Sequence, residues 1–229
     1  DIDINNRHQQ VSMAVNYGGL AVSNPKIQIK TMVTQNQRWD NAKINAAPQY
    51  IMADGLRWEH SKDLIFEAGN EFHKYEILDI HHPTMGIDRL EWDGTNYNVF
   101  PFATGQRLNY LYDEDANGAF YIRNSDNIEN DRTSEYVLVH YQLNCPDKVD
   151  GRVYISGMWT NNMFIPKYEM TYNSEKSCYE ATVLQKQGYY NYQYIMVDPY
   201  GVSRTMPTEG NFHQTENSYQ AYVYYKGLG

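Results

Sequence analysis

Short runs of alternating hydrophobic and polar residues recur along the chain, and most are bounded by Gly, Pro, Asn or Asp. An alternation of period two is typical of β-strands with one buried face, and no convincing helical periodicity accompanies it. The clearest runs predict strands at QQVSMAVNY, KIQIKTMV, FHKYEILDI, RLNYLYDED, AFYIRN, EYVLVHYQL, GRVYISGMW, CYEATVL, YYNYQYIMV and SYQAYVYY. Their spacing of roughly 10 residues is that of β-sandwiches and barrels, so the pattern predicts an all-β protein.

One polar segment interrupts this pattern near the middle of the chain. Residues 124–134 read NSDNIENDRTS, which is rich in turn formers and carries no strand pattern. With 229 residues the chain exceeds the commonest domain size of roughly 100 to 150 residues, so we place a domain boundary there. This predicts two consecutive β-sandwich domains, residues 1–130 and 131–229, the second of immunoglobulin-like size.

A β-hairpin is predicted within the first domain, at RLNYLYDEDANGAFYIRN (residues 107–124). Asn117-Gly118 accepts the positive φ angles that a tight hairpin turn demands. The turn also contains DEDANG, Asp113 to Gly118, which matches the opening of a calcium loop with oxygen ligands at alternate positions. The twelfth position of such a loop is Asn124 instead of Glu, and the flanks are strand-like, which favours a solvated turn over a calcium site.

Charge and composition exclude several classes of partner. The net charge is -9 and the 19 Lys and Arg residues are scattered, which argues against nucleic acid and against anionic membrane surfaces. No apolar run approaches the roughly 18 residues needed to span a bilayer, so direct membrane insertion is not expected. The 22 tyrosines fit a protein made of pleated, half-buried strands.

No constellation of catalytic or cofactor-binding residues is evident in the sequence, so we expect neither an enzyme nor a cofactor. His81 and His82 are adjacent, but neighbours on an extended chain point to opposite faces and rarely bind one metal ion. Cys145 and Cys178 lack the surroundings of a reactive thiol, and they fit either one disulfide or two structural thiols.

Aromatic residues supply the candidate binding site. Trp159 lies just past a predicted strand, and the strand YYNYQYIMV follows some 30 residues later. Alternation places Tyr190, Tyr192 and Tyr194 on one face of that strand and Ile195 with Val197 on the other. If the Ile195 face is buried, the three tyrosines form an outward row that, with Trp159, could bind a partner.

Five segments, taken in order, resemble the plug protein family of the type IX secretion system, also described as a domain of unknown function and found in Bacteroidota. They are VTQNQRWDNA (33–42), FEAGNEFHKYEI (66–77), YDEDANGAFYI (112–122), QKQGYYNYQYI (185–195) and TEGNFHQTENSYQAYVYY (208–225). The resemblance covers nearly the whole chain. It implies a non-catalytic β-sandwich protein in the periplasm, associated with the outer membrane, that binds and blocks the periplasmic mouth of the outer-membrane translocon barrel.

The same resemblance implies that this chain is a fragment. Family members begin with a further immunoglobulin-like domain, and they continue past the final strand with a short tail, whereas this chain ends at Gly229.

A narrower similarity concerns residues 151–198. The order of a strand, the loop SGMWTNN, a hairpin and GYYNYQYIMVD resembles early-set immunoglobulin-like domains that bind glycogen and starch. Trp159 is the position that matches one of their stacking tryptophans, whereas their basic residues have no counterpart. This similarity implies an alternative function, a carbohydrate-binding module of an outer-membrane glycan-utilisation system.

Overall fold

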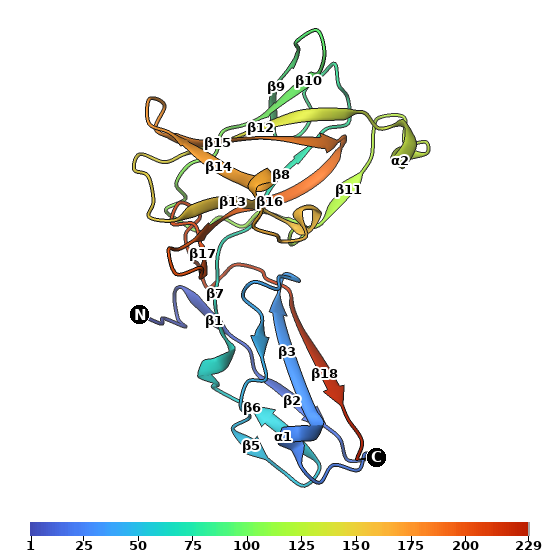
Figure 1. Cartoon of the computed structure of the whole chain (residues 1–229), viewed down its shortest axis with the longest axis vertical. Helices are drawn as coiled ribbons and strands as arrows, with labels where there is room; N and C mark the ends of the chain where they lie inside the picture. Colours follow the sequence, from blue (N-terminus) through green and yellow to red (C-terminus); the bar gives the residue numbers. More distant parts are fainter. Residues whose placement is uncertain (229) are drawn as a thin grey trace. The chain divides into compact units, whose positions relative to one another are not determined.

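The computed structural model describes residues 1–228, which form strands joined by turns and loops, with helices of only three or four residues (Figure 1). The all-β prediction is confirmed. The chain folds as two compact units: unit 1 comprises residues 1–69 with residues 211–228, and unit 2 comprises residues 70–210. Unit 1 is therefore discontinuous in sequence.

This division differs from the predicted domains 1–130 and 131–229, because the predicted boundary falls inside unit 2. Strands from both sides of residue 130 pair with one another: β8 (His73–Glu76) and β11 (Phe120–Ile122) with β16 (Gly188–Val197), and β10 (Tyr97–Pro101) with β12 (Tyr136–Asn144). Segment 124–134 is a turn that contains the short helix α2 (Asn130–Thr133). Turn-forming composition identifies a surface loop, but such a loop can join two strands of one domain as well as two domains.

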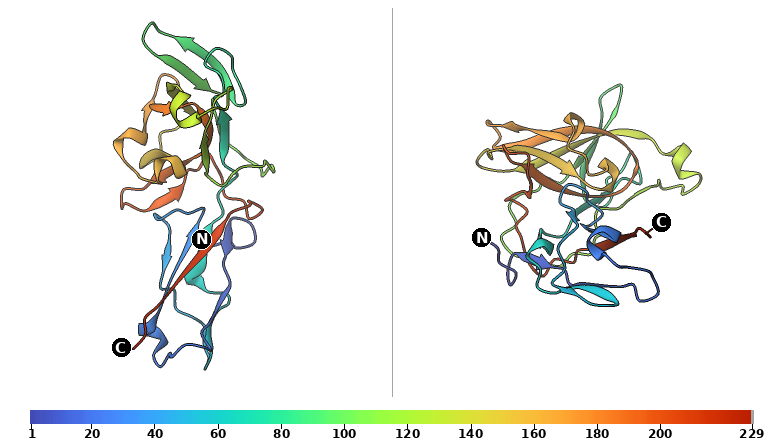
Figure 2. Two further views of the ribbon diagram at one scale, coloured as in Figure 1. Left: turned by 90° about the vertical axis from the view of Figure 1, so that its right-hand side faces the viewer. Right: turned by 60° about the horizontal axis from the view of Figure 1, so that its bottom comes forward.

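Unit 1 is built from small sheets. Its elements are β1 (His8–Gln10), β2 (Met13–Asn16), α1 (Pro25–Gln28), β3 (Ile29–Gln35), β4 (Lys43–Ile44), β5 (Tyr50–Ile51), β6 (Gly55–Trp58), η1 (Lys62–Leu64), β7 (Ile65–Glu67) and β18 (Tyr219–Tyr225). They pair in the orders β18-β3-β4, β2-β6-β5 and β1-β7. The last strand of the chain thus returns to the first unit, where Tyr219 lies opposite Gln35 and Tyr225 opposite Ile29 (Figure 2).

The core of unit 1 is small and aromatic. Trp58 is 1% exposed, and it is clustered with Val33, Leu56, Leu64 and Phe66. Tyr219 of β18 packs against this cluster, with its ring 5.2 Å from that of Phe66. The C-terminal strand therefore contributes directly to the folding of the N-terminal segment.

Unit 2 has one continuous network of ten strands. Besides the five strands named above, its elements are β9 (Ile87–Trp92), β13 (Arg152–Ser156), η2 (Met158–Thr160), η3 (Pro166–Tyr168), β14 (Glu169–Asn173), β15 (Cys178–Lys186) and β17 (Ser203–Thr205). The order is β11-β16-β13-β14-β15-β12-β10-β9, and β8 and β17 also pair with β16. All of these pairs are antiparallel except β10 with β12.

Strand β16 is the centre of unit 2. β11 and β13 pair with it, and so do β8 and β17, so that pairing partners follow almost its whole length (Figure 1). Seven of its ten residues, Gly188 and the six from Tyr190 to Ile195, are buried, and Ile195 is 0% exposed. Strand pairing fixes the edges of β16, whereas its faces are covered by side chains of the unit 2 core, to which Tyr190, Tyr192 and Tyr194 belong.

The hairpin predicted over residues 107–124 does not form. RLNYLYDED has no strand, and β11 pairs with β16 instead of with the chain that precedes it. The turn itself is as predicted, since Asn117 and Gly118 have φ angles of 50° and 93°. The other nine predicted runs each contain a strand, whereas the hairpin β9-β10 was missed because four of the six residues of β9 are exposed.

Candidate functional site

The three tyrosines predicted to form an outward row lie in the core of unit 2. Tyr190, Tyr192 and Tyr194 are 3%, 3% and 1% exposed. The alternation along β16 is as predicted, but the assignment of the tyrosine face to the surface is wrong. The tyrosine face packs in the hydrophobic core of unit 2, with Tyr75 and Tyr141 among its neighbours, and Ile195 on the other face is also buried.

The phenol groups of this core are satisfied within the protein. Tyr190 donates to the main-chain oxygen of Lys186 at 2.7 Å, and Tyr141 donates to Oε1 of Gln185 at the same distance. Tyr194 accepts a 3.4 Å hydrogen bond from Thr104. Burial raises the pKa of Tyr190 and of Tyr194 above the ordinary phenol value. These rings are packing groups whose polar ends have partners, as buried tyrosines require.

Trp159 is half-buried and is brought together with the same tyrosines. Its indole Nε1 donates to the main-chain oxygen of Asn191 at 2.8 Å. Its ring lies nearly parallel to Tyr141, at 6.2 Å between centroids, and edge-on to Tyr168 and Tyr190 at 5.6 and 5.5 Å. The four predicted site residues therefore meet, but they meet as part of the core and its border.

The loop DEDANG uses its oxygens to hold its own conformation. Asp115 accepts from the main-chain nitrogens of Phe72, at 2.6 Å, and Asn117, at 2.9 Å. Asp113 is paired with Nζ of Lys74 at 2.8 Å. Among residues 1–228, no group of three or more His, Cys, Asp or Glu side chains is arranged to hold a metal ion. The carboxylates that suggested calcium serve as acceptors for protein donors.

His81 and His82 lie in an exposed loop, where Nδ1 of His82 is 3.0 Å from Oδ2 of Asp79. Cys145 and Cys178 are buried free thiols. Cys178 is opposite Asn144 in the register of β12 with β15, so the next residue, Cys145, points to the other face. Burial raises the pKa of both thiols, which disfavours the nucleophilic thiolate form.

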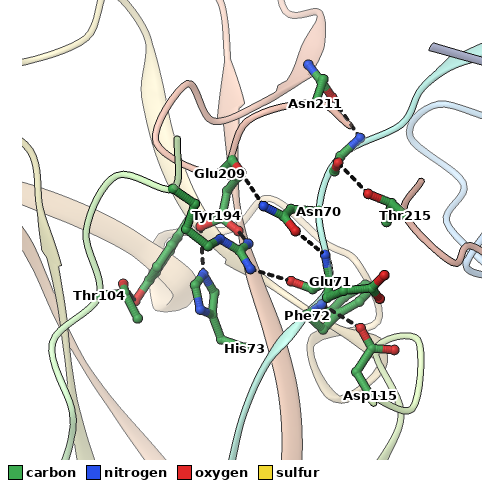
Figure 3. Close-up of polar contacts among 12 residues, drawn as sticks. Asn70, Glu71, Phe72, His73, Thr104, Asp115, Tyr194, Glu209, Asn211 and Thr215 are labelled. Carbon is green, nitrogen blue, oxygen red and sulfur yellow. Dashed lines mark hydrogen bonds and ion pairs between the residues drawn. The ribbon is translucent and has the colours of Figure 1, made fainter. Parts of the chain in front are cut away.

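A buried ionic cluster in unit 2 was not found from the sequence. Glu209 is 2% exposed, and its two carboxylate oxygens pair with Nε2 of His73, at 2.8 Å, and with the guanidinium of Arg107 (Figure 3). Its main-chain oxygen accepts from the side chain of Asn70 at 2.9 Å, and Arg107 also donates to the main-chain oxygen of Glu71. Both carboxylate oxygens are thus engaged within the protein.

The electrostatics of Glu209 follow from these partners. Burial alone raises the pKa of its carboxyl, but the charges and hydrogen bonds of His73 and Arg107 outweigh burial and hold the pKa below its ordinary value. The rings of Tyr192 and Tyr194 lie 5.2 and 5.6 Å from that of His73. A carboxylate so enclosed acts as a structural anion that fixes segments 70–73 and 107–110 against residue 209.

Within unit 1, Gly69 is held in a comparable way by the returning chain. Its nitrogen donates to Oδ1 of Asn211 at 2.7 Å, and its oxygen accepts from Oγ1 of Thr215 at 2.9 Å (Figure 3). The sequence offers only a weak signal for either arrangement. His73 lies in FEAGNEFHKYEI, whereas Glu209, Asn211 and Thr215 lie in TEGNFHQTENSYQAYVYY, and these two segments are among those that carry the family resemblance.

A second feature of unit 2 is a row of side chains across β9, β10, β12 and β15. The guanidinium carbon of Arg89 lies 3.8 Å from the ring centroid of Phe100, which stacks on His140 at 4.5 Å and 10°. The two ring nitrogens of His140 lie 2.7 Å from Asn98 and 3.0 Å from Thr182. Burial, followed by the charge of Arg89, lowers the pKa of His140.

A groove of about 310 Å³ runs beside this row, with Gln142, Lys176 and Glu180 among its lining residues. Arg89 is bonded to Glu91 at 2.8 Å, and Lys176 to Glu180 at 3.3 Å. The imidazole ring of His140 and the charged groups of Arg89 and Lys176 already have partners within the protein. The row therefore serves as a cross-strand ladder that stabilises the sheet.

An open surface of unit 1 is the edge strand β18. It is the terminal strand of the order β18-β3-β4, and within residues 1–228 no other strand pairs with its second edge (Figure 2). Its side chains from Ala221 to Tyr225 are exposed on both faces, with Val223 at 45% and Tyr224 at 58%. The strand has neither a charged residue nor a proline. The strand itself was predicted, but its place at a sheet edge was not.

Comparisons with known proteins show the fold but no function. No protein-family model and no curated protein matches the sequence. A crystal structure of a hypothetical protein from Parabacteroides merdae ATCC 43184 is similar over 100% of this chain, with a TM-score of 0.95 and 39% sequence identity. The chain spans 58% of the length of that protein. In the part of the chain described, no helix is long and apolar enough to cross a membrane.

Proposed function

We propose that this chain is part of a non-catalytic protein that binds another protein through the free edge of β18. The observation that carries the proposal is a run of seven residues without charge or proline at a sheet edge, of which the last five, Ala221 to Tyr225, are exposed on both faces. An edge strand presents unpaired main-chain N–H and C=O groups to any extended segment that approaches. Natural edge strands that must stay free are usually protected by lysine, proline or a bulge.

The side-chain arrangement supports the addition of a further strand at this edge. Val223 and Ala221 lie opposite Thr31 and Val33, so they share the face on which those two β3 residues are buried. Yet Val223 remains 45% exposed. A strand added beside β18 would cover this apolar face and would pair the main chain at the same time, which is the recognition mode of β-augmentation.

The partner that we propose is the outer-membrane translocon barrel of the type IX secretion system. This choice of partner relies on the ordered resemblance of five segments to the plug family. The same resemblance implies a protein of the periplasm that is associated with the outer membrane. The finer fold assignment belongs to the same proposal: both units are β-sandwich-like, and the strands from β12 to β16 form an early-set immunoglobulin-like domain.

The carbohydrate-binding alternative relied on Trp159, Tyr190, Tyr192 and Tyr194. Those rings pack against one another and against the core of unit 2, which leaves no platform there on which a pyranose ring could stack. The protein-binding function is therefore the one that the geometry supports better.

Immunoprecipitation of the native, full-length protein from detergent-solubilised membranes, followed by mass spectrometry, tests the proposal. We expect the translocon barrel to be recovered with it in preference to other outer-membrane proteins of similar abundance. Failure to recover the barrel, under conditions in which its known partners are recovered with it, would contradict the plug function.

A further inference from the structure

A pocket of about 240 Å³ opens in unit 1, and its lining does not include the residues of β18. It lies between the segment of α1 and β3 on one side and residues 45–51 on the other. Its floor is apolar and buried, since Ile29, Leu56 and Trp58 are 7%, 4% and 1% exposed. Pro48 and Ile51 add apolar surface to its wall.

The polar atoms beside this floor are already bonded. Nε1 of Trp58 donates to the main-chain oxygen of Ala46 at 2.8 Å. The side-chain oxygen of Asn45 accepts from the main-chain nitrogen of Thr31 at 3.1 Å. The interior therefore offers mainly hydrocarbon and ring surface to a ligand, and burial of an apolar group there would be favourable.

The rim carries two cations. Lys26 and Lys30 line the pocket and are exposed, and Nζ of Lys30 donates to the main-chain oxygen of Lys26 at 2.8 Å. Among residues 1–228, neither ammonium group forms an ion pair with a carboxylate. In a chain with a net charge of -9, two unpaired ammonium groups beside an apolar pocket select an anionic ligand with an apolar body.

We propose that this pocket binds a medium-chain carboxylate, with its hydrocarbon chain on the floor formed by Ile29, Leu56 and Trp58 and its carboxylate beside Lys26 and Lys30. The size fits: an apolar cavity of about 150 Å³ holds benzene, and drug-sized ligands need about 300 Å³ or more. An acyl chain of about eight carbons lies between these limits. This inference is independent of the proposed function of β18.

Titration of the protein with octanoate, followed by isothermal calorimetry and by the NMR signal of the Trp58 indole N–H, tests the proposal. We expect saturable binding at one site, weaker binding of octanol, and no binding of acetate. In Lys26→Gln/Lys30→Gln the affinity for octanoate should fall about 5- to 10-fold, while that for octanol stays the same, because only the carboxylate interacts with the rim.

A matched pair of variants separates the pocket from the general surface. Ile51 lines the pocket and is 55% exposed, whereas Ile44 lies outside its lining and is 68% exposed. Ile51→Glu should weaken octanoate binding, because it adds a carboxylate at the mouth, and Ile44→Glu should not. Absence of saturable binding, or equal octanoate affinities in all variants, would overturn the proposal.

Discussion

The indole nitrogen of Trp159 donates a 2.8 Å hydrogen bond to the main-chain oxygen of Asn191, in the middle of β16. This bond joins the turn after β13 to the central strand of unit 2, and it fixes the ring beside Tyr141 and Tyr190. A tryptophan that stacks sugars must keep one ring face free, whereas this one covers the border of the core. Its position after a strand is shared with carbohydrate-binding domains, but its contacts are structural.

Replacement of Trp159 should therefore change stability. We expect Trp159→Ala to lower the free energy of unfolding by about 3 kcal/mol, the lower end of the range for a packed aromatic residue, since this one is half-buried. Trp159→Phe should cost less, because it keeps most of the ring contacts. Urea unfolding measures both. An unchanged unfolding midpoint together with a loss of binding on a glycan array would restore the carbohydrate interpretation.

The tyrosine strand shows how far the sequence could predict this structure. The alternation of YYNYQYIMV correctly separates Tyr190, Tyr192 and Tyr194 from Ile195, because a period of two follows from strand geometry alone. Which face is covered depends on the side chains that distant strands bring against it, such as Tyr75 of β8, which pairs with β16, and Tyr141 of β12. Such long-range pairing leaves no trace in the local pattern.

The same limit applies to the ionic cluster and to the domain boundary. His73 and Glu209 are 136 residues apart in sequence, and neither stands in a run of chemistry-bearing residues. The turn at Asn117-Gly118 was predictable because it depends on local φ angles. The contacts that hold this turn to the rest of unit 2 were not predictable. The acceptor for the main-chain nitrogens of Ala116 and Gly118 is the side chain of Asn191, which lies in β16.

That turn gives a second prediction, with a matched control. Gly118 and Gly94 have φ angles of 93° and 94°, so alanine is strained at both. A Cβ atom on Gly118 would lie 3.1 Å from the ring of Phe72, whereas one on Gly94 would meet nothing within 4 Å. Thermal unfolding should show Gly118→Ala to be the more destabilising, by about 1 kcal/mol beyond the shared backbone strain. Equal losses would show that the loop can move away from Phe72.

Glu209 gives a prediction about the stability of the fold at acidic pH. Its pKa in the folded state lies below the ordinary value of 4.5, so its contribution to stability is present above about pH 4.5 and is lost as the pH falls through the folded-state pKa. Glu209→Gln should cost about 3 kcal/mol at pH 7, because it leaves a partly buried arginine without its counterion. Calorimetry should show this difference shrinking below about pH 4.5. A difference independent of pH would mean that shape, and not charge, makes Glu209 important.

The buried phenol groups give a prediction about the stability of the fold at alkaline pH. Burial raises the pKa of Tyr192 and Tyr194, and it raises the pKa of Tyr219 to about 12. Unfolded tyrosines lose their protons above about pH 10, so the stability due to these groups is complete below that pH and is lost as the pH rises towards the folded-state pKa values. Ultraviolet absorbance should show part of the phenolate signal appearing only together with the loss of β-sheet circular dichroism. Full ionisation of all tyrosines in the folded protein would contradict the buried positions.

The free edge of β18 gives the prediction that bears most directly on function. Val223→Lys places a charge on the face that an added strand would cover, and a lysine at an edge is a common natural protection against pairing. At 45% exposure the new side chain can reach water, so we expect a change in the free energy of unfolding within about 0.5 kcal/mol and a large loss of translocon barrel in immunoprecipitates. Leu184→Lys is the control, because Leu184 is 51% exposed on β15 of unit 2, where it lies opposite Leu138 of β12. Equal recovery of the barrel with both variants would show that the partner does not bind at this edge.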